Sequence, residues 1–283
     1  MGGRRRRYTE MPVPRRPPTP LLYPTPMPLT PEQITQAATE LAARRNSGKP
    51  GARLPESCRP LELEDAWQVQ LAVTRSLGQA VGGWKASPPS PGKLVVAPIY
   101  QPAISRAALC SVAFPADREL GSVKVEPELA FVLAKDLPAR EQPYTEAEID
   151  AAVGSVHAAL EICASRYADP TGLPFPEMLA DGLVNNGLWL GPELAAPEAA
   201  AFELGWQAGD EPRQTAPAQH PNGDPRAPLY WLANFLRERG LGLKAGQAVI
   251  TGSYAGVLTV PGGQALKFEY AGLARFELEF RRG

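Results

Sequence analysis

The chain has 283 residues, of which 44% are hydrophobic and 21% are charged. This composition is typical of a globular protein, and the length allows one large domain or a domain with a small appendage. The net charge is −1, but the first twenty residues hold six Arg and one Glu, which leaves 23 basic and 29 acidic residues in the rest. The body of the chain is therefore acidic, which argues against a general nucleic-acid binder.

The few cysteines and histidines restrict the metal chemistry that this chain can support. Cys58, Cys110 and Cys163 are far apart, so they predict neither a disulfide framework nor a zinc motif, and a reducing cytoplasm fits them best. With only His157 and His220 available, any metal must be held mainly by carboxylate oxygens. This ligand type favours Mg or Mn.

Residues 1–29 are rich in Arg and Pro, and we expect them to form a disordered tail. Nonspecific contact of this tail with nucleic acid or phosphate is the alternative. The basic run at residues 4–7 precedes no apolar stretch that would make an export signal, and Arg6 stands where myristoylation needs Ser or Thr. No segment approaches the roughly 20 apolar residues of a membrane span. We therefore expect a cytoplasmic protein with no membrane contact.

Two amphipathic helices are predicted after the tail. The first begins at the N-cap Thr30, with Pro31 at the first helical position and Gln33 completing a capping box. The second is predicted over residues 63–77, where apolar residues recur at helical spacing. Its predicted buried stripe consists of Leu63, Ala66, Val69, Val73 and Leu77. We assign residues 30–95 to a small helical N-terminal subdomain.

From residue 81 onward, short apolar segments are separated by Pro and Gly clusters, which predicts strands. We assign residues 96–283 to a β-rich catalytic domain that binds a metal. Two helices are expected to interrupt the strands. One follows the capping box at residues 145–148 and carries Ile149, Val153, Val156 and His157, and the other ends at Gly240. Alternating apolar residues on both sides of Gly272 predict a C-terminal hairpin.

Residues 122–133 (SVKVEPELAFVL) read as a strand with apolar side chains on one face. Because side chains alternate along a strand, Glu126 and Glu128 lie together on the other face, about 7 Å apart. Two carboxylates on one face can share a hard cation such as Mg or Mn. A solvated polar face explains the same alternation.

Glu161 stands between Leu160 and Ile162 in an apolar segment, so its carboxylate is expected to be buried. An unpaired buried carboxylate is costly, and Glu161 therefore needs a partner. A metal shared with Glu126 and Glu128 would supply one, and an ion pair with Arg166 is the rival explanation.

Six segments of the chain resemble, in order, those of 2-keto-4-pentenoate hydratases and the related 4-oxalocrotonate decarboxylases. Both belong to the fumarylacetoacetate hydrolase superfamily, and the resemblance covers roughly residues 61–280. It implies an α+β fold, a β-rich mixed β-roll with the small helical subdomain at its N-terminus. The segments are VGGWKAS (81–87), VEPELAFVL (125–133), ALEICASRYAD (159–169), LADGLVNNGLWLG (179–191), PLYWLANFL (228–236) and AVITGSYAG (248–256).

The resemblance also implies a set of site residues. The expected metal ligands are Glu126, Glu128 and Glu161, holding one Mg or Mn ion that acts as a Lewis acid. The expected catalytic residues are Lys85, for proton transfer or charge stabilisation, and Asp181, for positioning water or a backbone amide. The expected substrate contacts are Arg166, Thr251, Gly252 and Ser253. The ordinary alternatives are a loop lysine, a turn or cap aspartate, and a plain β-turn.

The implied function is a metal-dependent hydratase that adds water to 2-hydroxypenta-2,4-dienoate or a similar small acid. Departures from the family pattern at Gly182, Val184, Asp224 and Pro102 affect the handling of water more than metal binding. A homo-oligomer is implied by the family alone.

Three other functions stay open on the sequence. The first is a decarboxylase of a 2-oxo-enedioate, which would need Arg166 or Arg226 for the second carboxylate. The second is a relative without turnover that binds a small acid. The third, a C–C hydrolase, would need a His–carboxylate pair, and neither histidine is placed for one.

Overall fold

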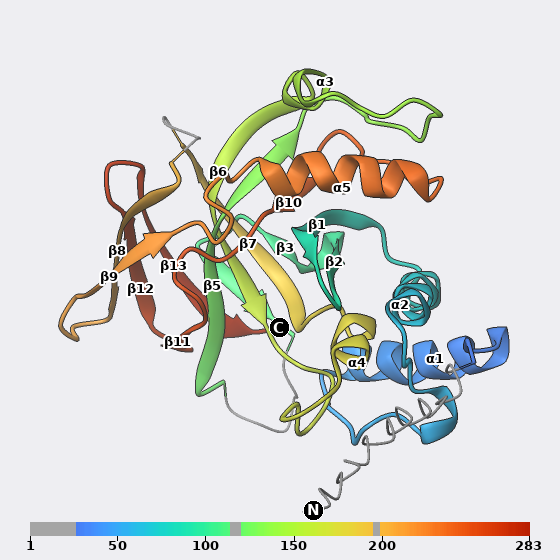
Figure 1. Cartoon of the computed structure of the whole chain (residues 1–283). Coiled ribbons are helices and arrows are strands. Elements are labelled where there is room, and N and C mark those ends of the chain that lie inside the picture. Colours follow the sequence, from blue (N-terminus) through green and yellow to red (C-terminus); the bar gives the residue numbers. More distant parts are fainter. Residues whose placement is uncertain (1–26, 114–119, 195–198) are drawn as a thin grey trace, which may run out of the picture.

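The computed structural model describes residues 27–113, 120–194 and 199–283. Within these ranges the chain forms two β-sheets with few helices (Figure 1), so the predicted α+β, β-rich fold is confirmed. Almost all of the tail predicted at residues 1–29 lies outside the described residues.

The two helices near the N-terminus follow the sequence prediction. Thr30 caps the first helix through the predicted capping box with Gln33, and the second helix covers residues 63–77. The core between these helices includes Leu41, Val69 and Val73. The helices of the described residues are α1 (Pro31–Ser47), η1 (Glu56–Cys58), α2 (Leu63–Leu77), η2 (Gln101–Ala103), α3 (Glu146–Asp150), α4 (Phe175–Ala180) and α5 (Ala227–Glu238).

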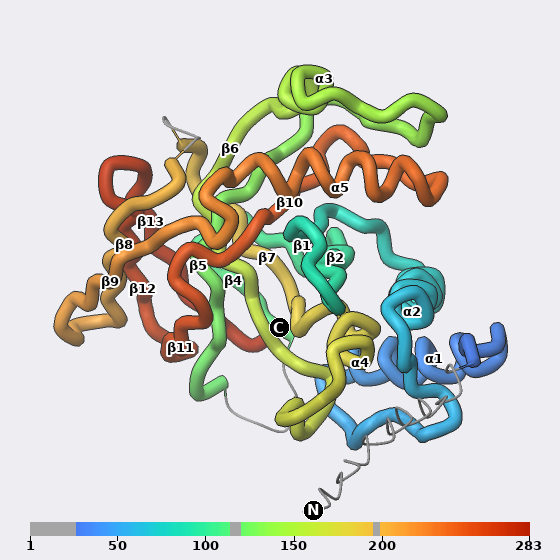
Figure 2. The backbone as a smooth tube through the Cα atoms, in the orientation of Figure 1, coloured from blue at the N-terminus to red at the C-terminus, as the bar shows by residue number. Residues whose placement is uncertain are grey.

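The larger sheet has the strand order β2-β1-β10-β5-β6-β7-β3, and β11 extends it by pairing with β5. Its central strands are almost completely buried, as expected for a sheet covered on both faces. Figures 1 and 2 show α1, α2 and α4 gathered at one end of the molecule, and α5 lying along β1. The strands are β1 (Val81–Ser90), β2 (Lys93–Tyr100), β3 (Ile104–Ser105), β5 (Ser122–Leu133), β6 (Val153–Cys163), β7 (Asn185–Glu193), β10 (Ala248–Ile250) and β11 (Leu258–Pro261).

The smaller sheet has the order β4-β13-β12-β8-β9 and contains the predicted C-terminal hairpin, β12 with β13. The two sheets pack together through aromatic side chains, and the Tyr270 hydroxyl donates a hydrogen bond of 2.8 Å to the Ala159 carbonyl. This bond ties the smaller sheet to β6. The strands are β4 (Leu109–Val112), β8 (Ala201–Ala208), β9 (Gln214–Gln219), β12 (Ala265–Tyr270) and β13 (Ala274–Arg282).

Two sequence-based predictions differ from the structure. The capping box at Thr145 is present, but α3 ends at Asp150, and Val153, Val156 and His157 belong to β6. The apolar spacing suits a helix or a strand, and pairing of β6 with β5 and β7 decides for the strand. The expected subdomain boundary at residue 95 falls inside β2, and both β1 and β2 belong to the larger sheet. The helices at the start of the chain therefore end at Leu77.

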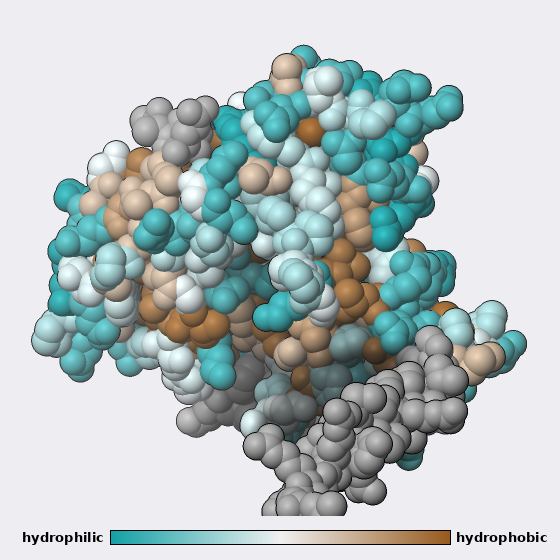
Figure 3. All heavy atoms as spheres, in the orientation of Figure 1, coloured by the Kyte–Doolittle hydropathy of each residue, from teal (hydrophilic) through white to brown (hydrophobic). Residues whose placement is uncertain are grey.

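Hydrophilic residues cover most of the face shown in Figure 3, and hydrophobic residues gather near its middle, in the region of β1 and β2. No helix among the described residues is both long and apolar enough to cross a membrane.

Candidate active site

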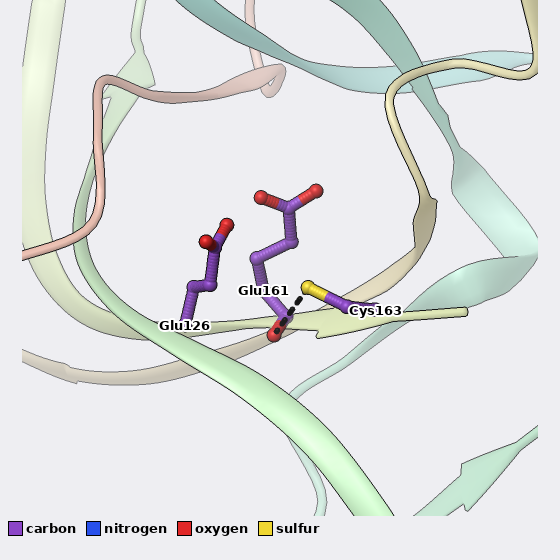
Figure 4. Close-up of side chains that lie close together, drawn as sticks. All are labelled: Glu126, Glu161 and Cys163. Atoms are coloured by element: carbon purple, nitrogen blue, oxygen red, sulfur yellow. Dashed lines mark hydrogen bonds between the residues drawn. The ribbon is translucent and has the colours of Figure 1, made fainter. Parts of the chain in front are cut away.

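Glu126 of β5 and Glu161 of β6 are direct partners in the antiparallel pairing of the two strands. Their side chains rise from the same face of the sheet (Figure 4). Single carboxylate oxygens of the two residues and the Cys163 sulfur lie within 4.8 Å of one another. Glu161 is completely buried and Glu126 is half-buried, so two acidic groups meet where water is scarce. The structure thus brings together two of the three predicted metal ligands.

Glu128 lies on the same face of β5 and is 2% exposed. Its carboxylate accepts a hydrogen bond of 2.7 Å from the backbone N–H of Gly252. Gly252 has φ +135°, and a Cβ there would lie 2.8 Å from Pro221, so the position requires glycine. The bond fixes the Glu128 carboxylate against the loop that follows β10.

Lys85 of β1 points its ammonium group at these carboxylates. Its Nζ lies 2.9 and 2.8 Å from the two Glu161 oxygens and 4.0 Å from Glu126 Oε2. The partner of Glu161 is therefore Lys85, and the ion pair with Arg166 considered from the sequence is wrong. Gly83 is needed nearby, because a Cβ there would collide with the carbonyl oxygen of Ala248 where β1 pairs with β10.

The chain between α4 and β7 forms an unusual turn next to Lys85 and the glutamates. Gly182, Leu183 and Val184 all have positive φ angles, of 75°, 52° and 59°. Such angles are strained for a leucine and still more for a β-branched valine. The Leu183 carbonyl accepts a hydrogen bond of 3.3 Å from Lys85 Nζ. The turn therefore brings a backbone acceptor to the lysine.

Asn185 follows this turn and is a site residue that the sequence reasoning missed. It is 1% exposed, and its side-chain amide donates a hydrogen bond of 2.8 Å to Glu161 Oε1. The only signal in the sequence was that the polar pair Asn185–Asn186 stands between apolar residues. Its contact with Glu161 depends on the turn, which no local pattern reveals.

Asp181 and Arg166 form a buried ion pair with each other, 2.5 Å from Oδ1 to Nε. The second Asp181 oxygen accepts from the Arg166 backbone N–H at 3.0 Å, and the guanidinium also reaches Asn186 Oδ1 at 3.1 Å. None of these contacts involves the glutamates. Asp181 is the C-terminal cap of α4, and its carboxylate contacts Arg166 next to the turn at residues 182–184.

The predicted loop at residues 251–253 directly follows β10, whose Ile250 pairs with Lys85. The Thr251 side chain is buried, and its hydroxyl has no hydrogen-bond partner among the described residues. The Thr251 carbonyl accepts from His220 Nε2 at 3.0 Å. Ser253 differs, because its hydroxyl donates to the nearby Gly256 carbonyl at 3.0 Å.

The two histidines do not form a pair with a carboxylate in the described residues. His157 hydrogen bonds to Ser155 and the Gly191 carbonyl, and His220 bonds to backbone groups of Thr251 and Asn222. The His–carboxylate arrangement needed by a C–C hydrolase is therefore absent from this part of the chain.

Burial and mutual repulsion shift the pKa values in the cluster. Burial raises the pKa of Glu126 to about 7, against the lowering effect of Lys85 and with a contribution from Glu161. Burial and then Glu161 hold the pKa of Glu128 well above its usual range. Burial alone would lower the pKa of Lys85, but the charges of Glu161 and Glu126 outweigh it and raise that pKa. The lysine is thus an ammonium at neutral pH.

Comparison with known proteins identifies the family of this chain. The sequence model of the fumarylacetoacetate (FAA) hydrolase C-terminal family matches residues 72–279. A 2-keto-4-pentenoate hydratase from Paraburkholderia xenovorans (strain LB400) is 30% identical over 264 residues, which cover 89% of this chain and 96% of the relative. A 2-keto-4-pentenoate hydratase 3 from Pseudomonas putida matches with the same identity and coverage.

A solved structure shares the fold. It is a 4-oxalocrotonate decarboxylase from Pseudomonas putida G7 in complex with magnesium and adipate, with a TM-score of 0.70 and 18% identity, covering 89% of this chain and 99% of the other. The family match spans most of the chain and includes Lys85 and the three glutamates. The chain therefore belongs to the fumarylacetoacetate hydrolase family.

Proposed function

We propose that this protein is a lyase, a metal-dependent hydratase that adds water to 2-hydroxypenta-2,4-dienoate or a similar small 2-oxo acid. The observation that carries the proposal is the contact of Lys85 Nζ with Glu161, at 2.8 Å, beside Glu126 at 4.0 Å. A protonated ammonium that faces carboxylates suits proton transfer next to a cation. The names of the 30%-identical relatives support the same reaction.

The residues present fit a divalent cation. Glu126, Glu128 and Glu161 carry three negative charges when ionised and Lys85 carries one positive charge, so two negative charges remain uncompensated in the cluster. Carboxylate oxygens on one face of a sheet are ligands that suit Mg²⁺ or Mn²⁺. When bound, the ion would polarise the 2-oxo oxygen of the substrate as a Lewis acid.

Lys85 would act as the proton donor of the site. The surrounding carboxylates keep it charged, since its pKa is raised above the ordinary value. A protonated lysine cannot serve as a base, but it can deliver a proton to the dienol carbon or stabilise negative charge that develops on the substrate. Asn185 and the Leu183 carbonyl would hold Glu161 and Lys85 in place for this step.

The loop after β10 would bind the substrate carboxylate. A buried hydroxyl without a partner costs free energy, and a ligand oxygen would relieve that cost at Thr251. The Gly252 N–H already donates a hydrogen bond to Glu128. It would therefore position Glu128 as a metal ligand and would not contact the substrate. Asp181 and Arg166 would act indirectly, by anchoring the turn at residues 182–184.

The experiment follows the dienoate absorbance when the purified protein is mixed with 2-hydroxypenta-2,4-dienoate and Mg²⁺ or Mn²⁺. The proposal predicts metal-dependent loss of absorbance, a hydrated product and no carbon dioxide. EDTA and the Glu126→Ala variant should each abolish the loss. No turnover by a protein that binds the metal would rule out the hydratase and leave the decarboxylase and the relative that only binds a small acid.

Decarboxylation of a 2-oxo-enedioate is a second candidate, favoured by one observation. Lys124 has no ion pair among the described residues and lines a cavity of about 280 Å³ that also includes Cys163 and Ser165. It lies two residues from Glu126 on the same face of β5, so it could receive a second carboxylate.

The two arginines considered for that task from the sequence are engaged elsewhere: Arg166 bonds to Asp181 and Arg226 to Asp150. Carbon dioxide released from 2-oxohex-3-enedioate, with a higher KM in Lys124→Met, would support the decarboxylase.

A cytoplasmic location, a homo-oligomeric state and the absence of nucleic-acid partners stay predictions.

A further inference from the structure

Arg45 of α1 donates hydrogen bonds to two backbone carbonyls that flank the left-handed turn at residues 182–184. Its Nη2 lies 3.4 Å from the Asp181 carbonyl oxygen and 3.0 Å from the Asn185 carbonyl oxygen. The guanidinium also lies over the ring of Tyr100 in β2, 5.2 Å from the ring centroid. Arg45 therefore connects the first helix of the described chain to both ends of the turn.

The charge of Arg45 is balanced by backbone groups. Among the described residues it forms no ion pair, and its hydrogen bonds go to the two carbonyls. Burial, and then the charge of Arg166, lower the pKa of Arg45 to about 10, so the guanidinium is still charged at neutral pH. A charge in such a place is costly unless its hydrogen bonds compensate. The contacts with the turn are therefore what keep this arginine in position.

The helices α1 and α2 also pack against the turn and against α4. The Leu183 side chain lies against the hydrophobic cluster between these helices, and Leu179 of α4 belongs to that cluster. Gln70 of α2 is 2% exposed, and its side-chain amide donates to the carbonyls of Leu179 and Val96. Apolar packing and hydrogen bonds from the start of the chain thus act on the same short segment.

The turn needs such support because two of its residues other than glycine have positive φ angles. Backbone of this kind persists only where the surrounding structure enforces it. The Leu183 carbonyl accepts from Lys85 Nζ at 3.3 Å, and the Asn185 side-chain amide donates to Glu161 Oε1 at 2.8 Å. If the turn relaxed, both contacts with the charged cluster would be lost. The hold of Arg45 on the turn therefore extends to the active site.

We propose that Arg45 is a positioning residue for the reaction: it holds the turn that keeps the Leu183 carbonyl on Lys85 and the Asn185 amide on Glu161. Arg45 acts through the turn and needs no contact with the substrate. The helices at the start of the described chain are thereby part of the catalytic apparatus. The inference rests on the proposed function and adds to it a residue outside the glutamate cluster.

The test compares Arg45→Met with Arg44→Met in the full-length protein, by hydrogen–deuterium exchange and by steady-state kinetics. Arg44 is a matched control because it makes contacts of the same kind elsewhere. Its guanidinium donates to the carbonyls of Ala52 and Arg166, at 2.7 and 3.4 Å, and lies 5.6 Å from the ring centroid of Tyr167. Both variants keep a long side chain and lose one guanidinium.

Exchange reports the turn without any activity measurement, because the N–H groups of Leu183 and Asn185 donate to the carbonyls of Met178 and Gly182. In Arg45→Met these two amides should exchange about 10-fold faster or more, since hydrogen bonds that oppose local opening are lost. The amides of β5 should stay protected, which separates a local change from unfolding. Equal exchange at the turn in the two variants would overturn the inference.

At saturating Mg²⁺, kcat of Arg45→Met for the dienoate should fall by about 10–100-fold while KM changes by less than about 3-fold, because catalytic groups are displaced and substrate contacts remain. Arg45→Lys keeps a charged donor and should recover part of kcat. An unchanged kcat in Arg45→Met, or an equal fall in Arg44→Met, would overturn this inference and leave the hydratase. No turnover by the wild type would overturn the proposed function, and exchange would still decide whether Arg45 holds the turn.

Discussion

Glu126 and Glu161 oppose each other across β5 and β6, and the ammonium of Lys85 lies 4.0 Å from one and 2.8 Å from the other. The strands β1, β5 and β6 thus bring three charged side chains into contact in the interior of the protein. Burying charges is costly unless they are paired. The pairing here is incomplete, because one lysine faces more than one carboxylate, and this imbalance is what a divalent cation would correct.

The first prediction concerns metal affinity. Glu161→Gln keeps the shape of the side chain and removes one negative charge and one ligand. We expect Mg²⁺ or Mn²⁺ binding to weaken by at least about 10–100-fold, the loss that even an outer partner causes. Calorimetric titration measures it. Glu203→Gln, at an exposed position of β8, is the control and should bind as the wild type does. Equal affinities for the two variants would contradict the assignment of Glu161.

The second prediction separates catalysis from binding. Lys85→Met removes the ammonium but keeps a long side chain. Turnover of the dienoate should fall by about 100-fold or more, as expected when a proton donor is lost. Metal affinity should be kept or increase, because the lysine no longer competes for Glu161. Lys93→Met, at an exposed position of β2, is the matched control. Full activity of Lys85→Met at saturating metal would rule out its catalytic role.

The third prediction concerns the anchor of the turn. Asp181→Ala leaves the buried Arg166 guanidinium without its main partner, and breaking such a buried pair costs about 3–5 kcal/mol. Urea denaturation should therefore show a large loss of unfolding free energy. Glu277→Ala breaks the exposed pair with Lys267 and should cost less than about 1 kcal/mol. Similar losses for the two variants would show that the Asp181 pair is not a structural anchor.

The fourth prediction follows from the cap of α3. The hydrogen bonds from Arg140, then those of Thr145, lower the pKa of Glu148 from 4.5 to about 2. A depressed pKa in the folded state means that this stabilisation is present above about pH 4.5 and is lost as the pH falls through about 2.

The difference in unfolding free energy between the wild type and Glu148→Gln should shrink over that interval. Urea denaturation at several pH values measures this difference. A constant difference would show that the charge of Glu148 contributes nothing.

Local patterns predicted much of the fold. The caps at Thr30 and Thr145 and the bounds of α2 and β5 were confirmed, because capping and side-chain periodicity depend on near neighbours in sequence. The length of α3 was wrong, because spacing alone does not separate a helix from a strand when both are buried. Strand pairing with β5 decides that choice, and it is a long-range effect.

Sequence patterns likewise predicted one part of the candidate site and missed the other part. Period two and the family resemblance pointed to Glu126, Glu128 and Glu161. The pairing of Arg166 with Asp181 and the contact of Asn185 with Glu161 depend on the left-handed turn at residues 182–184. That turn combines leucine and valine with positive φ, which no residue propensity suggests.

The most direct test of the metal centre is an anomalous difference map from a crystal grown with Mn²⁺. The account predicts one peak among Glu126, Glu128 and Glu161, about 2.1 Å from their oxygens, with Lys85 displaced from Glu161. A peak elsewhere, or none while Lys85 remains bound to Glu161, would contradict it.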